Sequence, residues 1–327
     1  KINHKSIKIS NMHLIRSLTL ISIVLFVSCG EGPKKNIESE TKFPIEGFWE
    51  RKGTIQFVNG VPVDTLFYGI DDTGEEEGFR NVKVYSEGNV LWINNANDKT
   101  NSWGAPGGYG KFEILKDTLT EFMSHGMGGM GAFLHYQKDS LGVSSLEFPF
   151  GYFLDDNTYT QMGGRVPNTE DNIQFGEYYE KLPVIKKTKM DGVWKRAYEI
   201  SYVNGVAIDT TSVPSDAILD LKIIRDGYFM VVVDQTNYIK DTKDPEYGGN
   251  GGFGQFEYDG KGNMIEYGEF GSWRGSVNNN TPRNAANAHY ASVTFYDNDM
   301  YQQITKDTLN QTWRQDKERG VVYKRVQ

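Results

Sequence analysis

Cysteine and histidine are both scarce in this chain of 327 residues. Cys29 is the only cysteine, which excludes a fold held together by disulfide bonds. Five histidines occur, and none belongs to an HExxH, serine-elbow or cysteine–histidine arrangement of the kind that hydrolases use. No apolar pattern predicts an amphipathic helix of useful length, and the apolar run at residues 18–27 is shorter than the about 20 residues that a membrane-spanning helix needs. Catalysis and a helical architecture are therefore both disfavoured.

The first 28 residues are typical of an export signal. They carry four basic residues and no acid, and the apolar run leads into Val27-Ser28-Cys29, which resembles the lipobox of bacterial lipoproteins. The resemblance implies cleavage before Cys29, lipidation of its thiol and a tether over residues 29–44. Residues 1–11 are predicted to be upstream sequence, because Met12 would begin a signal of ordinary length. The alternative is a spare cysteine at the end of an uncleaved anchor.

Charge and anchoring restrict the partners of the mature chain. Loss of residues 1–28 leaves 31 basic and 43 acidic residues, a net charge of −12, so nucleic acid and anionic lipid surfaces are not expected as partners. A lipidated Cys29 would hold the chain on the periplasmic or the surface face of the outer membrane. We therefore expect a cell-envelope protein that contacts the membrane through its lipid anchor; its protein partners are not predicted.

The mature chain contains an internal duplication. IEGFWERKGTIQFVNGVPVDT, at residues 45–65, matches MDGVWKRAYEISYVNGVAIDT, at residues 190–210, with ten identities. Further matches follow with shifting offsets, such as GYGKFE over GFGQFE. Each copy is too long for a solenoid repeat and has the length of a whole domain. The predicted organisation is a signal peptide at 1–28, a tether at 29–44, domains at 45–182 and 190–327, and a linker at 183–189.

Each copy has the pattern of an antiparallel β-meander. Apolar residues recur at period two, and turns such as Glu87-Gly88 and Asp226-Gly227 interrupt them about every ten residues. A meander of this length leaves two open edges unless it closes, and closure into a barrel hides them. The predicted fold is all-β, with two tandem antiparallel β-barrels.

The VNG turn near the start of each copy carries a prediction about strand register. A two-residue Asn-Gly loop would mix core and solvent residues on one face, so we predict a three-residue loop with a bulge at Gly60. Phe57 would then oppose Val61, and Ile55 would oppose Val63, with all four side chains on the core face.

Both copies resemble the lipocalin-like domains of bacterial secreted and membrane proteins. The shared motifs are a Gly-x-Trp in the first strand, a Gly-Gly-aromatic-Gly stretch followed by a Glu-bearing strand, and a terminal aromatic-x-Lys/Arg. The resemblance implies that the tryptophan closes one end of the barrel beneath a basic residue from the last strand. It places Trp194 under Arg325 in a cation–π contact. Trp49 has the same implied role, although copy one offers Lys181 where an arginine is usual.

A lipocalin-like barrel implies a small, partly apolar ligand at its open end. The candidate ligand-binding residues are glutamates that both copies keep and aromatic residues in or beside the glycine-rich segments: Trp103, Tyr109, Glu113, Glu121, Phe253, Glu257, Glu266 and Trp273. Each glutamate could instead satisfy a neighbouring Arg, Tyr or Trp, and the aromatics could simply plug the barrel. Two facing glutamates would allow general acid–base chemistry.

Soft metal ligands gather in FMSHGMGGMG, residues 122–131. Met123, His125 and Met127 share one face of an extended strand, with Met130 close behind, and thioethers plus imidazole suit Cu(I). Copy two has none of these ligands, and a pliable loop lining an apolar mouth explains the segment equally well. No cofactor is predicted beyond this hypothesis, because the YGGNGGFG run is interpreted as a flexible loop leading into a strand and not as a dinucleotide fingerprint.

The sequence therefore favours a non-enzymatic envelope lipoprotein that binds a small molecule in one or both barrels. Two alternatives stay open. One is a surface interaction or glycan-contacting lipoprotein with side-chain-filled barrels, and the other is a hydrolase-type enzyme that uses barrel glutamates.

Overall fold

The structure of the chain is a computed structural model, and it describes residues 44–67, 80–95, 107–165, 172–203, 206–213, 219–234, 249–271, 287–306 and 317–326. The predicted signal segment, Cys29 and nearly all of the tether lie outside these residues. No helix in the described part of the chain is long and apolar enough to cross a membrane.

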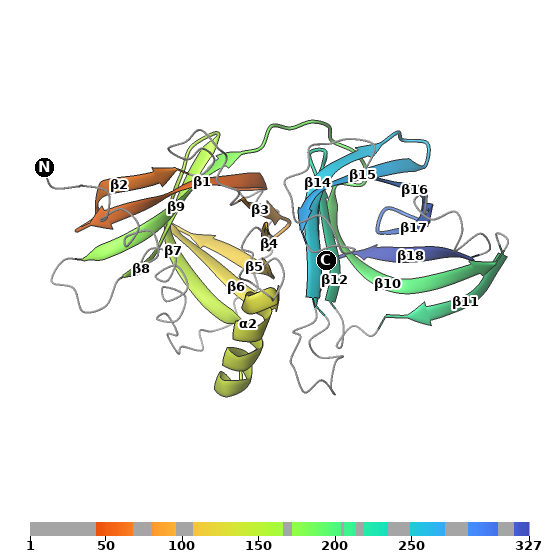
Figure 1. The fold of residues 1–327 in the computed structure, drawn as a ribbon, viewed down its shortest axis with the longest axis horizontal. Helices are drawn as coiled ribbons and strands as arrows, with labels where there is room; N and C mark the ends of the chain where they lie inside the picture. The colour runs from red at the N-terminus through yellow and green to blue at the C-terminus, as the bar shows by residue number, and fades with distance from the viewer. Residues whose placement is uncertain are drawn as a thin grey trace, which may run out of the picture.

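Two β-barrels lie side by side along the longest axis of the molecule (Figure 1). Barrel 1 contains β1 (Gly47–Val58), β2 (Val61–Phe67), β3 (Asn81–Ser86), β4 (Asn89–Asn94), β5 (Gly107–Leu115), β6 (Thr118–Met127), α2 (Gly128–Leu141), β7 (Leu146–Leu154), β8 (Thr158–Arg165) and β9 (Ile173–Lys181). Barrel 2 contains β10 (Gly192–Val203), β11 (Val206–Ser212), β12 (Leu219–Arg225), β13 (Tyr228–Asp234), β14 (Gly249–Tyr258), β15 (Asn263–Gly271), β16 (Ala288–Phe295), β17 (Met300–Lys306) and β18 (Lys317–Arg325).

Both sheets are antiparallel meanders that close on themselves. The first runs in the order β2-β1-β3 and onward to β9, and β1 also pairs with β9. The second repeats this order, and β10 pairs with β18. Within the described residues, β2 pairs only with residues 53–58 of β1, and β11 pairs only with residues 198–203 of β10. The other eight strands of each sheet form the closed barrel. The prediction of an all-β fold with two tandem antiparallel barrels is confirmed.

The register predicted for the VNG hairpin is wrong. Asn59 and Gly60 form a two-residue turn with φ angles of 53° and 79°, the positive values of a type I′ turn, and the valines on either side pair with each other. The β-bulge lies farther along, at Val63, which is skipped in the β1–β2 register because Gln56 pairs with Asp64 and Phe57 pairs with Pro62. Val61 and Val63 are 60% and 55% exposed. The predicted register is wrong because β2 is an additional edge strand, so neither of its faces is constrained to cover the core.

Helix α2 contradicts the expectation that the chain has no helix of useful length. It follows Met127 directly and starts in a Gly-Gly-Met-Gly stretch, in which three of the four residues are glycine, a poor helix former. Met130 and Leu134 pack into the core of barrel 1, which stabilises the helix through tertiary contacts. The segment at 122–131 is therefore the end of a strand followed by a helix and not an extended loop. Figure 1 shows α2 beside the ends of β5 and β6.

A tryptophan closes one end of each barrel. In barrel 1, Lys181 Nζ lies 5.0 Å from the ring centroid of Trp49, and in barrel 2, Arg325 Cζ lies 4.5 Å from that of Trp194. Both indole nitrogens donate to the carbonyl oxygen four residues earlier, at 2.7 Å. Gly47 has a φ of 139°, and a Cβ there would lie 2.8 Å from Lys181 Cε. The glycine of Gly-x-Trp thus leaves room for the cation, and the opposite end of each barrel is its mouth.

The barrels pack against each other through equivalent outer faces. One hydrophobic cluster joins Val82, Val84, Leu91 and Ile93 of β3 and β4 to Leu221, Ile223, Met230 and Val232 of β12 and β13. The duplication aligns these two sets one to one. The contact is therefore close to isologous, as in a dimer of identical subunits, although a single chain supplies both halves.

Met127 lies where the two glycine-rich strands approach each other. A Cβ at Gly107 would collide with its side chain, and a Cβ at Gly251 would lie 2.6 Å from its Cε. These two glycines occupy equivalent positions in GGYG and GGFG. The glycine-rich motif of each copy is thus part of a strand that allows close packing between the barrels, and the described part of the YGGNGGFG run, residues 249–254, belongs to β14.

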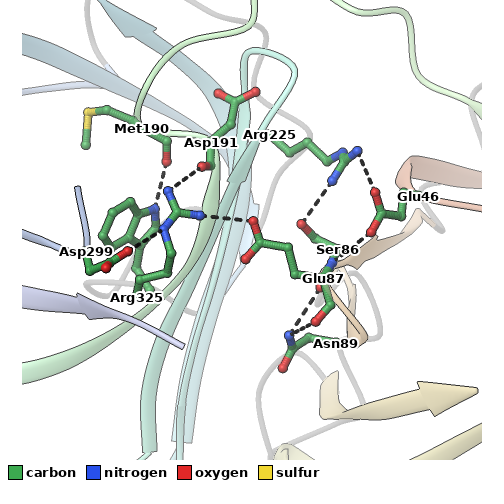
Figure 2. Close-up of polar contacts among 10 residues, drawn as sticks. Glu46, Ser86, Glu87, Asn89, Met190, Asp191, Arg225, Asp299 and Arg325 are labelled. Carbon is green, nitrogen blue, oxygen red and sulfur yellow. Dashed lines mark hydrogen bonds and ion pairs between the residues drawn. The ribbon is translucent and has the colours of Figure 1, made fainter. Parts of the chain in front are cut away.

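Ion pairs surround this apolar contact. Arg225 lies 3.0 Å from Glu46 and donates to Ser86 Oγ at 3.2 Å, and Arg325 lies 3.0 Å from Glu87 (Figure 2). Arg325 therefore covers Trp194 in its own barrel and also contacts the β3–β4 turn of the other. The Arg325 side chain therefore both closes barrel 2 and helps to hold it against barrel 1.

Gly251→Ala is expected to lower the free energy of unfolding by about 1–3 kcal/mol, because overpacking a filled contact forces backbone shifts. The new Cβ would lie 2.6 Å from the carbonyl oxygen of Val231 as well as from Met127, and that carbonyl is held in the sheet. Urea denaturation of the mature chain measures the loss.

Gly151→Ala is the matched control, because a Cβ there would meet Met162 Cε at 3.3 Å and no backbone atom closer than 3.9 Å. We expect its effect to stay within about 0.5 kcal/mol. Equal losses for the two variants would contradict the proposed role of Gly251.

Candidate functional site

A lysine and a glutamate form an ion pair inside barrel 1. Lys83 Nζ, from β3, lies 2.9 Å from Glu121 Oε1 on β6 and donates to Gln161 Oε1 on β8, also at 2.9 Å. Tyr85 donates to the same glutamate oxygen at 2.5 Å. Both charged side chains are 4% exposed. Because these strands are not neighbours in the sheet, the contacts cross the interior of the barrel.

Barrel 2 contains the equivalent cluster. Lys222 Nζ lies 2.5 Å from Glu266 Oε1 and donates to Gln303 Oε1 at 3.1 Å. Burial alone would lower the pKa of Lys222, but the Glu266 carboxylate outweighs it, and the pKa is raised. The lysine is therefore charged at neutral pH, although its side chain is only 4% exposed.

A second ion pair completes the interior of barrel 1. Arg51 Nη1 lies 2.7 Å from Glu177 Oε1, and the other oxygen of that carboxylate accepts from Gln161 at 2.7 Å and from Tyr179 at 2.8 Å. Burial would raise the pKa of Glu177, but Arg51, Lys83 and these two hydrogen bonds together lower it. Gln161 bridges the two ion pairs, so the four charges form one network.

Barrel 2 keeps the arginine but takes its carboxylate from a different strand. Arg196, on β10, pairs with Asp220 on β12 at 2.6 Å. Val321 stands on β18 where barrel 1 has Glu177 on β9, and Asn81 stands on β3 where barrel 2 has Asp220. The carboxylate has moved from one neighbour of the first strand to the other. In both interiors, each of the two cations consequently lies in contact with a carboxylate.

Among the buried polar atoms of barrel 2 without a hydrogen-bond partner in the described residues are the hydroxyl of Tyr301 and Oδ1 of Asp220; Oδ1 of Asn81, at the position of barrel 1 equivalent to Asp220, also has none. Tyr301 is 0% exposed and stacks on Tyr323 with ring centroids 5.2 Å apart. Burial raises the pKa of Tyr323 to about 12 and that of Tyr301 well above its ordinary value, so both phenols stay protonated at neutral pH. In barrel 1 the equivalent hydroxyl, that of Tyr159, lies 3.4 Å from the Gln161 side-chain oxygen.

The four predicted glutamates divide between the inside and the outside of the barrels. Glu121 and Glu266 face the interiors and bind the lysines described above. Glu113 follows Phe112, which packs inside barrel 1, so it projects outward and is exposed. Glu257 has the same place on β14 and is half-buried.

The predicted aromatic residues do not line the interiors where the structure describes them. Tyr109 and Phe253 point out of their barrels into the cluster between them. The Tyr109 hydroxyl donates to Asn89 at 2.9 Å. Trp103 and Trp273 lie outside the described residues.

The four residues suggested as copper ligands do not all lie in one cluster. Met123 packs inside barrel 1, whereas Met127 belongs to the cluster between the barrels. A bulge in the β5–β6 ladder separates them, and His125 follows it opposite Tyr109. Met130 lies on α2 in the core of barrel 1. In the described part of the chain no group of three or more His, Cys, Asp or Glu residues is placed to hold a metal.

The lysines are the interior residues that sequence reasoning missed. Lys83 lies in VKV and Lys222 in LKI, each at an otherwise apolar position of a strand that is buried throughout. The sequence could have identified these two lysines, because a lysine that both copies keep among apolar strand residues needs a carboxylate or another polar partner inside the fold.

Fold and interior define the class of this protein: two tandem, closed, eight-stranded antiparallel barrels with ion pairs buried inside them, a fold compatible with a lipocalin-like binding protein. No protein-family model matches the chain, and no curated protein matches it. Among solved structures, the chain is similar to an uncharacterized protein from Saccharomyces cerevisiae, with a TM-score of 0.37, 11% identity, and coverage of 86% of this chain and 98% of that one. It is also similar to a protein of unknown function from the DUF3598 family of Nostoc punctiforme, with a TM-score of 0.23, 9% identity, and coverage of 86% and 97%.

Glu177→Gln is expected to lower the free energy of unfolding at pH 7 by about 1–3 kcal/mol, because Arg51 would lose its carboxylate. The folded pKa of Glu177 is lowered, so its contribution is present above the unfolded pKa of about 4.3 and is lost as the pH falls through the folded value. The variant should therefore lose less stability than the wild type between pH 7 and pH 3, measured by urea denaturation at each pH.

Adding Asn81→Asp to Glu177→Gln tests whether the carboxylate that pairs with the arginine can come from either neighbouring strand. The double variant has its carboxylate on β3, the position equivalent to that of Asp220 in barrel 2. The double variant should regain at least half of the lost stability at pH 7. Barrel 1 suits this test better than barrel 2, where Arg196 also contacts Glu199. A double variant less stable than Glu177→Gln alone would show that the two positions are not equivalent.

Proposed function

We propose that this protein is a non-enzymatic lipoprotein of the cell envelope that binds a small, partly apolar molecule inside a barrel. The observation that carries the proposal is the buried Lys–Glu–Gln cluster that crosses the interior of each barrel. A cluster of this kind offers both donors and acceptors to the polar group of a ligand, beneath walls that are mostly apolar.

Stability alone is a weak explanation for these clusters. Replacing a buried ion pair by well-packed apolar side chains is often neutral or stabilising, because the charges must give up their hydration. Both copies nevertheless keep the lysine, the glutamate and the glutamine, even though the carboxylate that pairs with the arginine has moved between strands. Retention of a polar interior through this divergence favours a role in recognition.

The pairing of the charges favours binding over catalysis. Glu121 lies against Lys83, and Glu177 lies against Arg51, so each carboxylate of barrel 1 faces a cation. The hydrolase alternative needs two carboxylates that face each other, so that one of them holds a proton at neutral pH. Barrel 2 has the same alternation of charges.

The envelope location rests on the lipobox resemblance at Cys29, which lies outside the described residues. A lipid on this thiol would tether the barrels to the membrane through residues 29–44 and leave them in an oxidising compartment. Folding through paired charges and apolar packing, with no second cysteine to form a disulfide, fits that setting.

Mass spectrometry of the protein purified from the membranes of its own host tests anchor and ligand together. The denaturing spectrum should show a polypeptide that begins at Cys29 and carries the mass of a lipid. The native spectrum should show an additional non-covalent mass that disappears on denaturation. Cys29→Ser is the control, and it should remove the lipid mass while retaining the non-covalent one.

A native mass equal to that of the lipidated polypeptide would contradict the proposed binding function. The interaction alternative would then be favoured, since β2 and β11 expose Val63 at 55% and Ile208 at 60% on edge strands. A polypeptide without lipid in the membrane fraction would contradict the anchor.

A further inference from the structure

The mouth half of barrel 1 is filled by large side chains. Trp92 lies directly opposite Lys83 in the β3–β4 ladder, and Phe148 lies opposite Glu121 in the β6–β7 ladder. Residues directly opposite each other in an antiparallel pair have their side chains on the same face of the sheet. Both aromatic rings therefore share the interior with the ion pair.

Two more residues fill the remaining space. Met123 and Trp92 lie so close to Gly108 that a Cβ there would be 2.6 Å from the methionine Cε and 2.8 Å from the indole Nε1. Phe150 lies against Gly163 in the same way, with two ring carbons at 3.0 Å, and its ring centroid is 6.0 Å from Lys83 Nζ. Barrel 1 is thus packed from the ion pair toward its mouth, where α2 adds Met130 and Leu134 to the same core.

Barrel 2 carries smaller side chains at all four positions. The strand ladders replace Trp92 by Val231, Met123 by Gly268, Phe148 by His289 and Phe150 by Ala291. Val231 and Ala291 are 5% and 6% exposed and belong to the buried hydrophobic cluster of barrel 2. The ion pair beneath them is the same as in barrel 1.

We infer that barrel 2, and not barrel 1, is the binding barrel, and that it takes an uncharged molecule with an aromatic or similarly flat ring and one hydrogen-bonding group. The inference rests on the proposed binding function and assigns it to one half of the chain. Barrel 1 then serves as the packed partner against which barrel 2 is docked.

The chemistry of the ligand follows from what barrel 2 lacks and what it keeps. At these four positions barrel 2 has lost an indole, two phenyl rings and a thioether, although Phe229 and Tyr258 are larger than Val90 and Ile114, their equivalents in barrel 1. Apolar space left by large side chains binds small aromatic molecules. Each cation in the interior already lies against a carboxylate, so a charged ligand would bring a charge without a partner. The buried hydroxyl of Tyr301 offers hydrogen-bonding capacity to a neutral group, whereas its barrel 1 equivalent, that of Tyr159, already donates to Gln161.

Titration with 1-aminoanthracene, an uncharged aromatic amine whose fluorescence rises in apolar surroundings, tests the inference on the full mature chain. We expect saturable binding of one equivalent per chain. Val231→Trp and Ala291→Phe, which place barrel 1 side chains in barrel 2, should each weaken binding at least tenfold. Val206→Trp is the matched control, because it makes the same substitution at a site that is 64% exposed, and it should bind as the wild type does.

Circular dichroism and the thermal midpoint must show that each variant is folded, and having two separate filling variants keeps the test decisive if one of them is not. Unchanged affinity in folded Val231→Trp or Ala291→Phe protein would overturn the assignment to barrel 2. A native adduct from the host that survives both substitutions would overturn it as well, while leaving the proposed binding function intact. If neither the native adduct nor 1-aminoanthracene binding is found, the proposed function fails together with the inference.

Discussion

The structure depends on keeping charge inside a closed barrel. A lysine in the interior of a β-barrel is tolerated only where a carboxylate and further acceptors replace its lost hydration. Lys83 meets this requirement with Glu121 and Gln161, and Lys222 meets it with Glu266 and Gln303. These contacts reach across from β3 to β6 and β8, and from β12 to β15 and β17, so the interior network ties together strands that the backbone ladder does not join.

The duplication separates what must stay constant from what is free to change. The outer faces of β3, β4, β12 and β13 form one apolar contact, and Met127 requires glycine on both approaching strands. These constraints act on the outside of each barrel and leave the mouth half of each interior free to diverge. Barrel 1 has filled its mouth half with Trp92, Met123 and aromatic neighbours, whereas barrel 2 carries smaller residues at the equivalent positions above an unchanged ion pair. One copy supplies packing and the other supplies the proposed binding space.

Much of the architecture was predictable because the two copies of the duplicated sequence carry the same pattern. Period-two patterning, regular turns and the matching copies led to two barrels, and the lipocalin-like motifs led to the contact between Trp194 and Arg325. Local pattern was insufficient where tertiary contacts decide the outcome. Helix α2 starts with poor helix formers, and its apolar stripe of Met130, Phe133 and Leu134 is too short to be distinguished without the core that it covers.

The interior was only half predictable for a similar reason. Glu121 and Glu266 were identified because both copies keep them, but their partners come from strands that are distant in the sequence and adjacent only across the barrel. The hairpin parity argument assumed that β2 covers the core, and the sequence alone does not show that it is an additional edge strand. Tyr109 and Phe253 were expected beside a ligand, whereas docking between the barrels turns them outward.

A high-resolution crystal structure of the protein isolated from its own host would test the central claim most directly. The account predicts non-protein electron density inside barrel 2, between the Lys222–Glu266 pair and Val231, and none at the equivalent place in barrel 1. An interior of barrel 2 that is filled by its own side chains, with no density beyond the polypeptide, would contradict it.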